Sequence, residues 1–301
     1  MNRIVLAYAG GLDTSVAIPW LAEQYGAEVV CVTLDLGQGK DLQSVRERAL
    51  SAGALRAHVL DVREEFAQQY ILPALQADAV YEGRYPLAPA LGRPLIAKKL
   101  IEIARIENAS AIAHGCSGKG NDQVRIEVSA RALMPGVRVV APARESGMSR
   151  EAKAEFARVH GIAVAQASPS PYAIDANLWG RSVQRGVLED PWVEPPSDIF
   201  ALTRDPSRCP GEPAYLELQF ERGVPVAVNR VPMPLLEIIG SVGTIAGHHG
   251  VGRIDAIESR LAGAPARAVH EVPAAAVLHA AHRELERCVI PRDLERTKRD
   301  L

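Results

Sequence analysis

Two hydrophobic periods alternate through the first half of the chain. Short, mostly apolar runs predict strands at 3–9, 28–36, 56–62, 109–114 and 137–142. Segments with helical apolar spacing fill the gaps and predict helices at 14–25, 41–52, 63–77, 94–107, 122–133 and 149–160. The strands are apolar on both faces, which is typical of a parallel sheet covered by helices on each side. The pattern therefore predicts a doubly wound α/β domain, with the loops after its strands along one edge.

The pattern changes near residue 165, where the stretch QASPSPYAIDANLWG is rich in Ser, Pro and Ala. We place the domain boundary there and predict domains at 1–165 and 166–301. In the second, AYLELQFERGVPVAVNR alternates on both sides of Arg222-Gly223, which indicates a hairpin. Helical patterns follow at 234–247 and 272–288. The second part is predicted to be a smaller α+β domain.

Composition narrows the class of protein. The 301 residues are 48% hydrophobic and 23% charged, which is ordinary for a globular protein with a buried core. A net charge of −2 gives no reason to expect a nucleic acid or a membrane as partner. No apolar run approaches a membrane span and a strand-like segment follows Met1 at once, so we expect a cytoplasmic protein. The scattered Cys31, Cys116, Cys209 and Cys288 lack metal-ligand spacing, and we expect reduced, mostly buried thiols.

The stretch YAGGLDTS, after the first predicted strand, carries the first candidate site. Two glycines before a helix start make an anion site, because the first helical N–H groups are unpaired and the dipole end is positive. No Gly-Lys-Ser/Thr follows and the G-x-G-x-x-G spacing is absent, so neither a Walker loop nor a dinucleotide fingerprint is present. A tight turn capped by Asp, Thr or Ser explains this stretch equally well when it is taken alone.

A second stretch, AHGCSGKGNDQVRIE, also runs from a strand through a glycine-rich loop into a helix. Both loops follow strand ends, where ligands sit in open α/β sheets. Charged groups of both signs, Lys119, Asp122 and Arg125, accompany the second loop. Two such loops at one edge suit a polyanion together with a zwitterion; a merely solvated loop is the alternative.

The order of six motifs resembles that of argininosuccinate synthases: AYAGGLDTS, YPLAPALGRPLIAK, AHGCSGKGNDQVRIE, YAIDANLWGRSV, LEDPW and GVGRIDAIESR. The resemblance covers nearly the whole chain. It implies a sheet of the ATP-pyrophosphatase (adenine nucleotide α-hydrolase-like) type with a PP-loop. It also implies an AMP-forming ligase: a citrulline ureido oxygen attacks the α-phosphorus of ATP and releases pyrophosphate, and the aspartate amine then displaces AMP from the adenylated citrulline. Alignment of substrates and charge stabilisation suffice for this chemistry, with Mg²⁺ bound with ATP.

The resemblance also implies site residues. Asp13, Ser15, Lys119 and Arg93 are the expected catalytic residues. The expected ATP contacts are Ala7, Tyr8, Ala9, Gly10, Gly11, Leu12, Asp13, Thr14, Ser15 and Gly115. Aspartate is expected at Ser117, Asn121 and Asp122. The acceptor, citrulline or an analogue, is expected at Tyr85, Asn121, Arg125, Ser182, Glu258 and His270, and no protein-held metal site is expected.

Four positions depart from the family. Ala9, Ala90 and Ala173 replace serines, and His270 replaces a tyrosine. Loss of a hydroxyl from a buried polar contact costs about 1–3 kcal/mol. The leading interpretation is a ligase joining aspartate to an adenylated ureido or amide acceptor; ordinary argininosuccinate synthesis and a non-catalytic nucleotide- or aspartate-binding protein are the alternatives.

Family members continue beyond the final PRDLERTKRDL, so we expect either a naturally shortened paralogue or a loss of the remainder. A homo-oligomer, a dimer or a tetramer, is expected. Other features are expected to be structural. His279 and His282 should lie on an exposed helix face, His248-His249 at a helix end, and Trp179 in the core at the domain junction. ERTKRDL should be a solvated tail.

Overall fold

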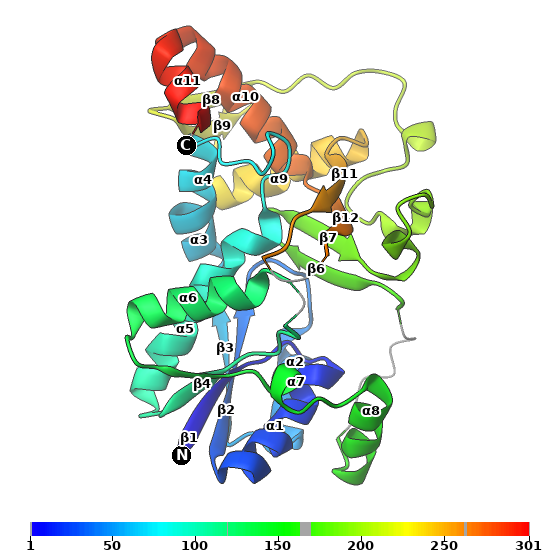
Figure 1. Cartoon of the computed structure of the whole chain (residues 1–301). Helices are drawn as coiled ribbons and strands as arrows, with labels where there is room; N and C mark the ends of the chain where they lie inside the picture. Colours follow the sequence, from blue (N-terminus) through cyan, green and yellow to red (C-terminus); the bar gives the residue numbers. More distant parts are fainter. Residues whose placement is uncertain (1, 119, 163–169, 262–263, 301) are drawn as a thin grey trace.

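The computed structural model describes residues 2–118, 120–162, 170–261 and 264–300 (Figure 1). The predicted domain boundary at 165/166 falls outside these ranges. The first half forms a five-stranded parallel sheet in the order β3-β2-β1-β4-β5. Its strands are β1 (Arg3–Ala7), β2 (Glu28–Asp35), β3 (Arg56–Asp61), β4 (Ala111–Ala113) and β5 (Arg138–Val140). Each predicted strand is present; β1 to β3 are one or two residues shorter than predicted, and β4 and β5 are half the predicted length.

Helices connect these strands. They are α1 (Leu12–Tyr25), α2 (Leu42–Ser51), α3 (Arg63–Phe66), the π-helical turn η1 (Ala67–Ile71), α4 (Leu72–Gln76), α5 (Ala88–Ile106), α6 (Asp122–Leu133), α7 (Pro142–Glu145) and α8 (Arg150–Val159). The helix predicted at 63–77 is therefore interrupted by a π turn. Helix α5 begins before the predicted residue 94 because Pro89 in its first turn fits a helix start and Pro94 is accommodated inside it.

Successive side chains along β1 point to opposite faces of the sheet, and both faces are apolar. Ile4 and Leu6 are fully buried in the cluster that contains α1 and α2 side chains. Val5 is fully buried in the cluster on the other face, with Leu95 and Leu100 of α5. Both faces are therefore covered, as the sequence pattern predicts. No helix in the described part of the chain combines the length and apolarity needed to cross a bilayer.

The second half contains two antiparallel sheets. The larger has the order β11-β12-β7-β6, with β6 (Ala173–Asn177), β7 (Gly180–Gln184), β11 (Arg253–Glu258) and β12 (Ala266–Glu271). The smaller contains the predicted hairpin, with β8 (Leu218–Glu221), β9 (Val224–Val228) and β10 (Val231–Pro232). Arg222 and Gly223 both have positive φ, at 52° and 78°, as a two-residue hairpin turn requires.

The helices of the second half are α9 (Leu235–His248), α10 (Pro273–Val289) and α11 (Arg292–Asp300), with short 3₁₀ turns η2 (Gly186–Glu189), η3 (Ser197–Ile199) and η4 (Pro206–Arg208). Both predicted long helices are present, and α9 ends at His248 as expected. Most of ERTKRDL lies in α11, where Arg296 and Thr297 are exposed and Glu295 and Lys298 are half-buried, so the predicted tail is helical but largely solvated. There Lys298 donates to the carbonyl of Gln76, which ties α11 to the end of α4.

Two other expectations are corrected by burial. His279 and His282 are only 4% and 5% exposed, because α10 packs this face against α4 and the turn after it. The free thiols are mostly not buried: Cys31 is buried, Cys116 and Cys209 are half-buried and Cys288 is exposed.

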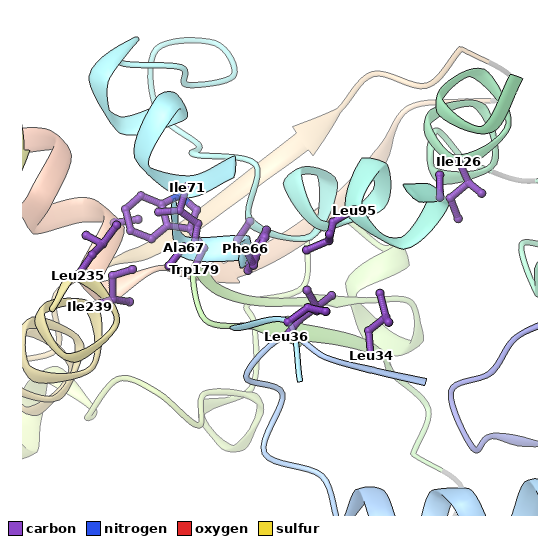
Figure 2. Packing of buried hydrophobic residues seen from close by; sticks show 14 of the residues in the cluster. Leu34, Leu36, Phe66, Ala67, Ile71, Leu95, Ile126, Trp179, Leu235 and Ile239 are labelled. Carbon is purple, nitrogen blue, oxygen red and sulfur yellow. The ribbon is translucent and has the colours of Figure 1, made fainter. Parts of the chain in front are cut away.

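One apolar cluster joins the two halves of the molecule (Figure 2). Leu34 and Leu36 at the end of β2 belong to it, together with Phe66 and Ile71 from the segment after β3. Trp179, between β6 and β7, is 1% exposed in this cluster, which confirms its expected place in the core. The carboxyl ends of the parallel strands are therefore held beside the antiparallel sheet.

Candidate functional site

The first glycine loop lies between β1 and α1. Gly10 has φ of +77°, and a Cβ there would lie 2.9 Å from Arg48 Nη2. Nothing lies within 4 Å of a Cβ position on Gly11, and no side chain caps α1. The expected tight turn is therefore present, but no Asp, Thr or Ser side chain caps the helix. The first-turn N–H groups, which lack helical partners, remain for an anionic ligand.

Two basic groups from distant elements stand at this loop. Arg48 comes from α2; its Nη1 donates to Ser44 Oγ at 2.8 Å, while its buried Nε lacks a partner among the described residues. Lys153 from α8 lies 2.7 Å from Asp13 Oδ1. The sequence did not predict Arg48 or Lys153 as residues of this site, because only the fold brings α2 and α8 to the end of β1.

The hydroxyls of the first loop are used internally. Ser15 is 3% exposed, and its Oγ lies 2.9 Å from the Tyr8 hydroxyl. Burial raises the pKa of Tyr8, so this phenol stays protonated. Thr14 Oγ1 donates to the Gly11 carbonyl at 3.2 Å. The loop offers backbone N–H groups and nearby cations, while its hydroxyls stabilise the turn.

The second glycine loop, between β4 and α6, touches the first. A Cβ on Gly115 would lie 2.9 Å from Thr14 Cγ2, so glycine is needed for this approach. His114 is buried, and burial lowers its pKa, so its neutral Nδ1 accepts from the Cys116 amide at 3.3 Å. Ser117 is exposed, and Lys119 lies outside the described residues.

A cluster of two arginines and two carboxylates links this loop to α5 and β6. Arg93 Nη2 donates to Asp122 Oδ2 at 2.9 Å and contacts Asp175 Oδ2, and Arg125 Nη1 donates to Asp122 Oδ1 at 2.9 Å. Burial opposes the charge on Arg93, but both carboxylates outweigh it and hold the pKa of Arg93 above its usual value. Burial likewise raises the pKa of Asp122, but Arg93 and Arg125 outweigh it and lower that pKa, so Asp122 is ionised.

A cavity of about 250 Å³ opens beside this cluster. The expected acceptor residues Tyr85, Arg125, Ser182 and Glu258 all line it, together with Asp122 from the expected aspartate set. Ala90 and Ala173, at positions where the sequence resemblance implies serine, line it as well. Two polar lining residues, Asp175 and Gln184, were not predicted from the sequence. The available signal was their position in the sequence: Asp175 lies inside the motif YAIDANLWGRSV, and Gln184 follows it directly.

His270, an expected acceptor residue, lies behind the cavity wall and is fully buried. Its ring stacks on Tyr85 with centroids 3.7 Å apart at 15°. Its Nδ1 is 2.6 Å from Ser182 Oγ, and Ser182 Oγ is 3.1 Å from the Tyr85 hydroxyl. Its Nε2 lies 3.0 Å from Glu258 Oε1 without the angle of a hydrogen bond. His270 therefore supports three lining residues.

Asn121 differs from the other expected residues. Its Nδ2 donates to the Ser259 carbonyl at 3.0 Å, and its Oδ1 accepts from the Leu261 amide at 2.8 Å. Both ends of the amide therefore bridge the second glycine loop to the turn after β11. Among the described residues, no three His, Cys, Asp or Glu side chains gather in a way that would hold a metal ion.

A parallel sheet with an open glycine loop at the carboxyl end of its first strand defines a nucleotide-binding α/β domain. Residues 3–163 match the arginosuccinate synthase N-terminal HUP domain, and residues 172–301 match the arginosuccinate synthase C-terminal domain. The chain belongs to the argininosuccinate synthase family, whose members are ATP-dependent, AMP-forming carbon–nitrogen ligases.

Curated relatives agree with this assignment. The argininosuccinate synthase of Oceanobacillus iheyensis is 53% identical over 99% of this chain and 71% of the relative. That of Symbiobacterium thermophilum is 53% identical over 99% of this chain and 74% of the relative. A solved 4-thiouridine synthetase–RNA complex with bound ATP is 20% identical, with a TM-score of 0.38, over 54% of this chain and 41% of that chain.

Proposed function

We propose that this chain is an argininosuccinate synthase of arginine biosynthesis, which joins citrulline to aspartate and converts ATP to AMP and pyrophosphate. The observation that carries the proposal is the convergence of Tyr85, Arg125, Ser182 and Glu258 on one cavity beside the second glycine loop. The identity of 53% over 99% of the chain to argininosuccinate synthases supports citrulline itself as acceptor.

The nucleotide is proposed to bind at the first loop. Its pyrophosphate end would meet the backbone N–H groups from Gly10 to Ser15, with Gly115 near the nucleotide. The open space at Gly11 and the cation Arg48 support this proposal. Mg²⁺ is proposed to arrive with the ATP phosphates, because such ions are commonly held by substrate phosphates and few protein carboxylates. It would neutralise the charge of the leaving pyrophosphate.

Aspartate is proposed to bind at Ser117, Asn121 and Asp122, next to the acceptor. Asp122 is ionised and suits the aspartate ammonium group. Binding by Asn121 requires that its amide exchange its bonds to the turn after β11 for bonds to the substrate. Arg93 is proposed to hold Asp122 in position, while Lys119 would contact the reacting groups.

A second candidate is a ligase for a citrulline analogue. The observation that favours it is the presence of Ala90 and Ala173 in the cavity wall, where family hydroxyls are missing. Ala90→Ser and Ala173→Ser are expected to lower KM for citrulline, each by roughly fivefold if the added hydroxyl gains one hydrogen bond. Steady-state kinetics with citrulline measures this; unchanged KM in both variants favours the analogue.

Release of pyrophosphate and AMP tests the proposed function. Purified protein receives Mg²⁺, ATP and aspartate, with or without citrulline, and mass spectrometry identifies the product. Citrulline-dependent argininosuccinate is the expected result. Absence of turnover despite bound ATP and aspartate would overturn citrulline as acceptor, and a screen of ureido and amide compounds would follow.

We further propose a homo-oligomer, a dimer or a tetramer, in the cytoplasm, and the domain division at 165/166. Trp192 and Tyr215 are 94% and 88% exposed, and such aromatic side chains are typical of subunit interfaces. Light scattering coupled to size-exclusion chromatography measures the assembly; a monomer at micromolar concentration would contradict it.

A further inference from the structure

The cavity of about 250 Å³ lined by Tyr85, Arg125, Ser182 and Glu258 is called the acceptor cavity below. A second cavity, of about 530 Å³, adjoins it. Gln184 at the end of β7 lines both, so the two cavities share this part of their wall. The second cavity extends from Gly118 of the second glycine loop to the turns after β7 and β11. Its lining residues are Gly118, Gln184, Arg185, Glu189, Pro191, Ile257, Arg260, Ala264, Pro265, Ala266 and Arg267.

The charge of this lining is positive. Arg267 is occupied, because it donates to Asp255 and to the carbonyls of Asp190 and Val193. The guanidinium groups of Arg185 and Arg260, by contrast, have no hydrogen-bond or ion-pair partner within the described ranges. Glu189 supplies one carboxylate against these two free cations.

The backbone of Arg185 is strained. Its φ of 70° and ψ of −169° lie in a region that essentially only glycine occupies. The surrounding structure enforces this conformation, because Val183 before it and Leu188 after it are both fully packed in one apolar cluster. Gly186 packs closely on the Tyr172 ring, because a Cβ on Gly186 would lie 3.0 Å from Tyr172 Cε1. Strain of this kind persists where the chain must hold a side chain in one place.

The backbone around Arg260 is also held on both sides. The Ser259 carbonyl accepts from Asn121, and the Ser259 amide donates to the Tyr81 hydroxyl at 3.2 Å. On the other side, the Leu261 amide donates to Asn121. Two guanidinium groups that lack partners among the described residues therefore stand on fixed backbone at one cavity. Guanidinium groups pair with carboxylate and phosphate oxygens through directed hydrogen bonds.

We propose that this second cavity is an oxyanion site, in which Arg185 and Arg260 bind a carboxylate or phosphate group. The site is defined by geometry and does not depend on the proposed reaction. The anion has two possible sources: a free anion, or an anionic group of the molecule in the acceptor cavity, since Gln184 lines both cavities.

Calorimetric titration with inorganic phosphate at low ionic strength tests the site. The protein is first saturated with Mg²⁺ and a non-hydrolysable ATP analogue, so that the first glycine loop is occupied. Arg185→Gly and Arg260→Gln are expected to bind phosphate roughly tenfold or more weakly than the unmodified chain. Arg222→Gly is the matched control, because it removes an exposed arginine with positive φ from the β8–β9 turn. Equal affinity in all four proteins would overturn the proposal.

Thermal melting separates loss of the site from loss of the fold. Arg185→Gly relieves strain and is expected to melt no lower than the unmodified chain. Repeating the titration with citrulline distinguishes the sources. If citrulline excludes phosphate, the site serves an anionic group of the acceptor; if both bind together, it serves a free anion. The titration reads phosphate affinity and does not require turnover, so it tests the anion site even if the proposed reaction does not occur.

Discussion

At the scale of single residues, side-chain bonds decide which groups of the first glycine loop and of the acceptor cavity remain open to a ligand. Ala9 precedes Gly10 in a loop whose remaining hydroxyls, on Thr14 and Ser15, are bonded internally. The proposed binding of pyrophosphate by this loop therefore depends on backbone N–H groups and on Arg48. Behind the wall of the acceptor cavity, the buried His270 stacks on Tyr85 and lies within hydrogen-bond distance of Ser182.

Restoring the missing hydroxyl at position 9 is expected to accelerate pyrophosphate release. Ala9→Ser adds one donor at the mouth of the loop, and one net hydrogen bond gained in the transition state corresponds to roughly twofold to tenfold in kcat. Coupled pyrophosphate assays measure the change. Ala22→Ser, on the exposed side of α1, is the control. Equal kcat in the Ala9→Ser protein and the unmodified chain would show that the backbone alone suffices.

At the scale of elements, β7 and α10 are each fixed by contacts with residues distant in sequence. Strand β7 supplies Ser182 and Gln184 to the acceptor cavity, and its first residue, Gly180, lies tightly against the residues after β12. Helix α10 is tied to the turn after α4 by Asp78, at 2.9 Å from both His279 Nδ1 and Arg283 Nε.

Gly180→Ala is expected to lower the free energy of unfolding by about 2–4 kcal/mol. A Cβ there would lie 2.6 Å from both the Glu271 carbonyl oxygen and Val272 Cγ1, so the β7–β12 pairing must shift. Urea titration measures the loss. Gly211→Ala is matched, because its Cβ position is open and its φ is not positive. Equal stability of both variants would show that this contact relaxes without penalty.

The Asp78 carboxylate should make the free energy of unfolding depend on pH. Burial would raise its pKa, but hydrogen bonds from His279 and Arg283 outweigh burial and lower the pKa from 3.8 to about 2. A lowered folded-state pKa stabilises the protein above about pH 4, and this contribution is lost as pH falls towards 2. Asp78→Asn should therefore lower the free energy of unfolding by about 2 kcal/mol at pH 7 and by almost nothing near pH 2.

Urea titrations at several pH values measure this difference. Glu284→Gln, which removes an exposed carboxylate paired with Arg287 on the same helix, should leave stability unchanged at every pH. A difference for Asp78→Asn that stays constant down to pH 2 would contradict the role of its charge.

At the scale of the whole molecule, the two halves meet through the apolar cluster around Trp179 and through the amide of Asn121. Figure 1 shows the antiparallel sheet of β6, β7, β11 and β12 beside the carboxyl ends of the parallel strands. The acceptor cavity takes its walls from both halves, with Tyr85 and Arg125 from the first and Ser182 and Glu258 from the second. Relative placement of the halves therefore sets the cavity's shape.

Asn121→Ala is expected to loosen the turn after β11 in the absence of any ligand. The Leu261 amide loses its acceptor, so its hydrogen exchange should become roughly tenfold faster. Exchange measured by NMR or mass spectrometry checks this. Ser129→Ala, further along α6, should leave the Leu261 rate as it is. An unchanged rate in Asn121→Ala would show that other contacts hold this turn.

Much of the first domain could be predicted from the sequence, because local physics determines it. Apolar runs on both faces specify β1 to β5 as buried parallel strands, and Gly10-Gly11 before a helix specifies an open loop. The family motifs also identify Tyr85, Arg125, Ser182 and Glu258 as acceptor residues, and these four line one cavity. Their roles in binding stay predictions.

Only the tertiary structure decided the rest. Strand β7 (GRSVQ) is short and contains three polar residues, so its pairing with β12, about 90 positions away in sequence, does not follow from its own pattern. The burial of His270, His279 and His282 arises from packing between distant elements, and so do the approach of Arg48 to Gly10 and the cavity beside Arg185. Local periodicity carries no information about such contacts. The chain by itself therefore determines its nucleotide-binding sheet and loop, while long-range packing decides the shape of its acceptor cavity.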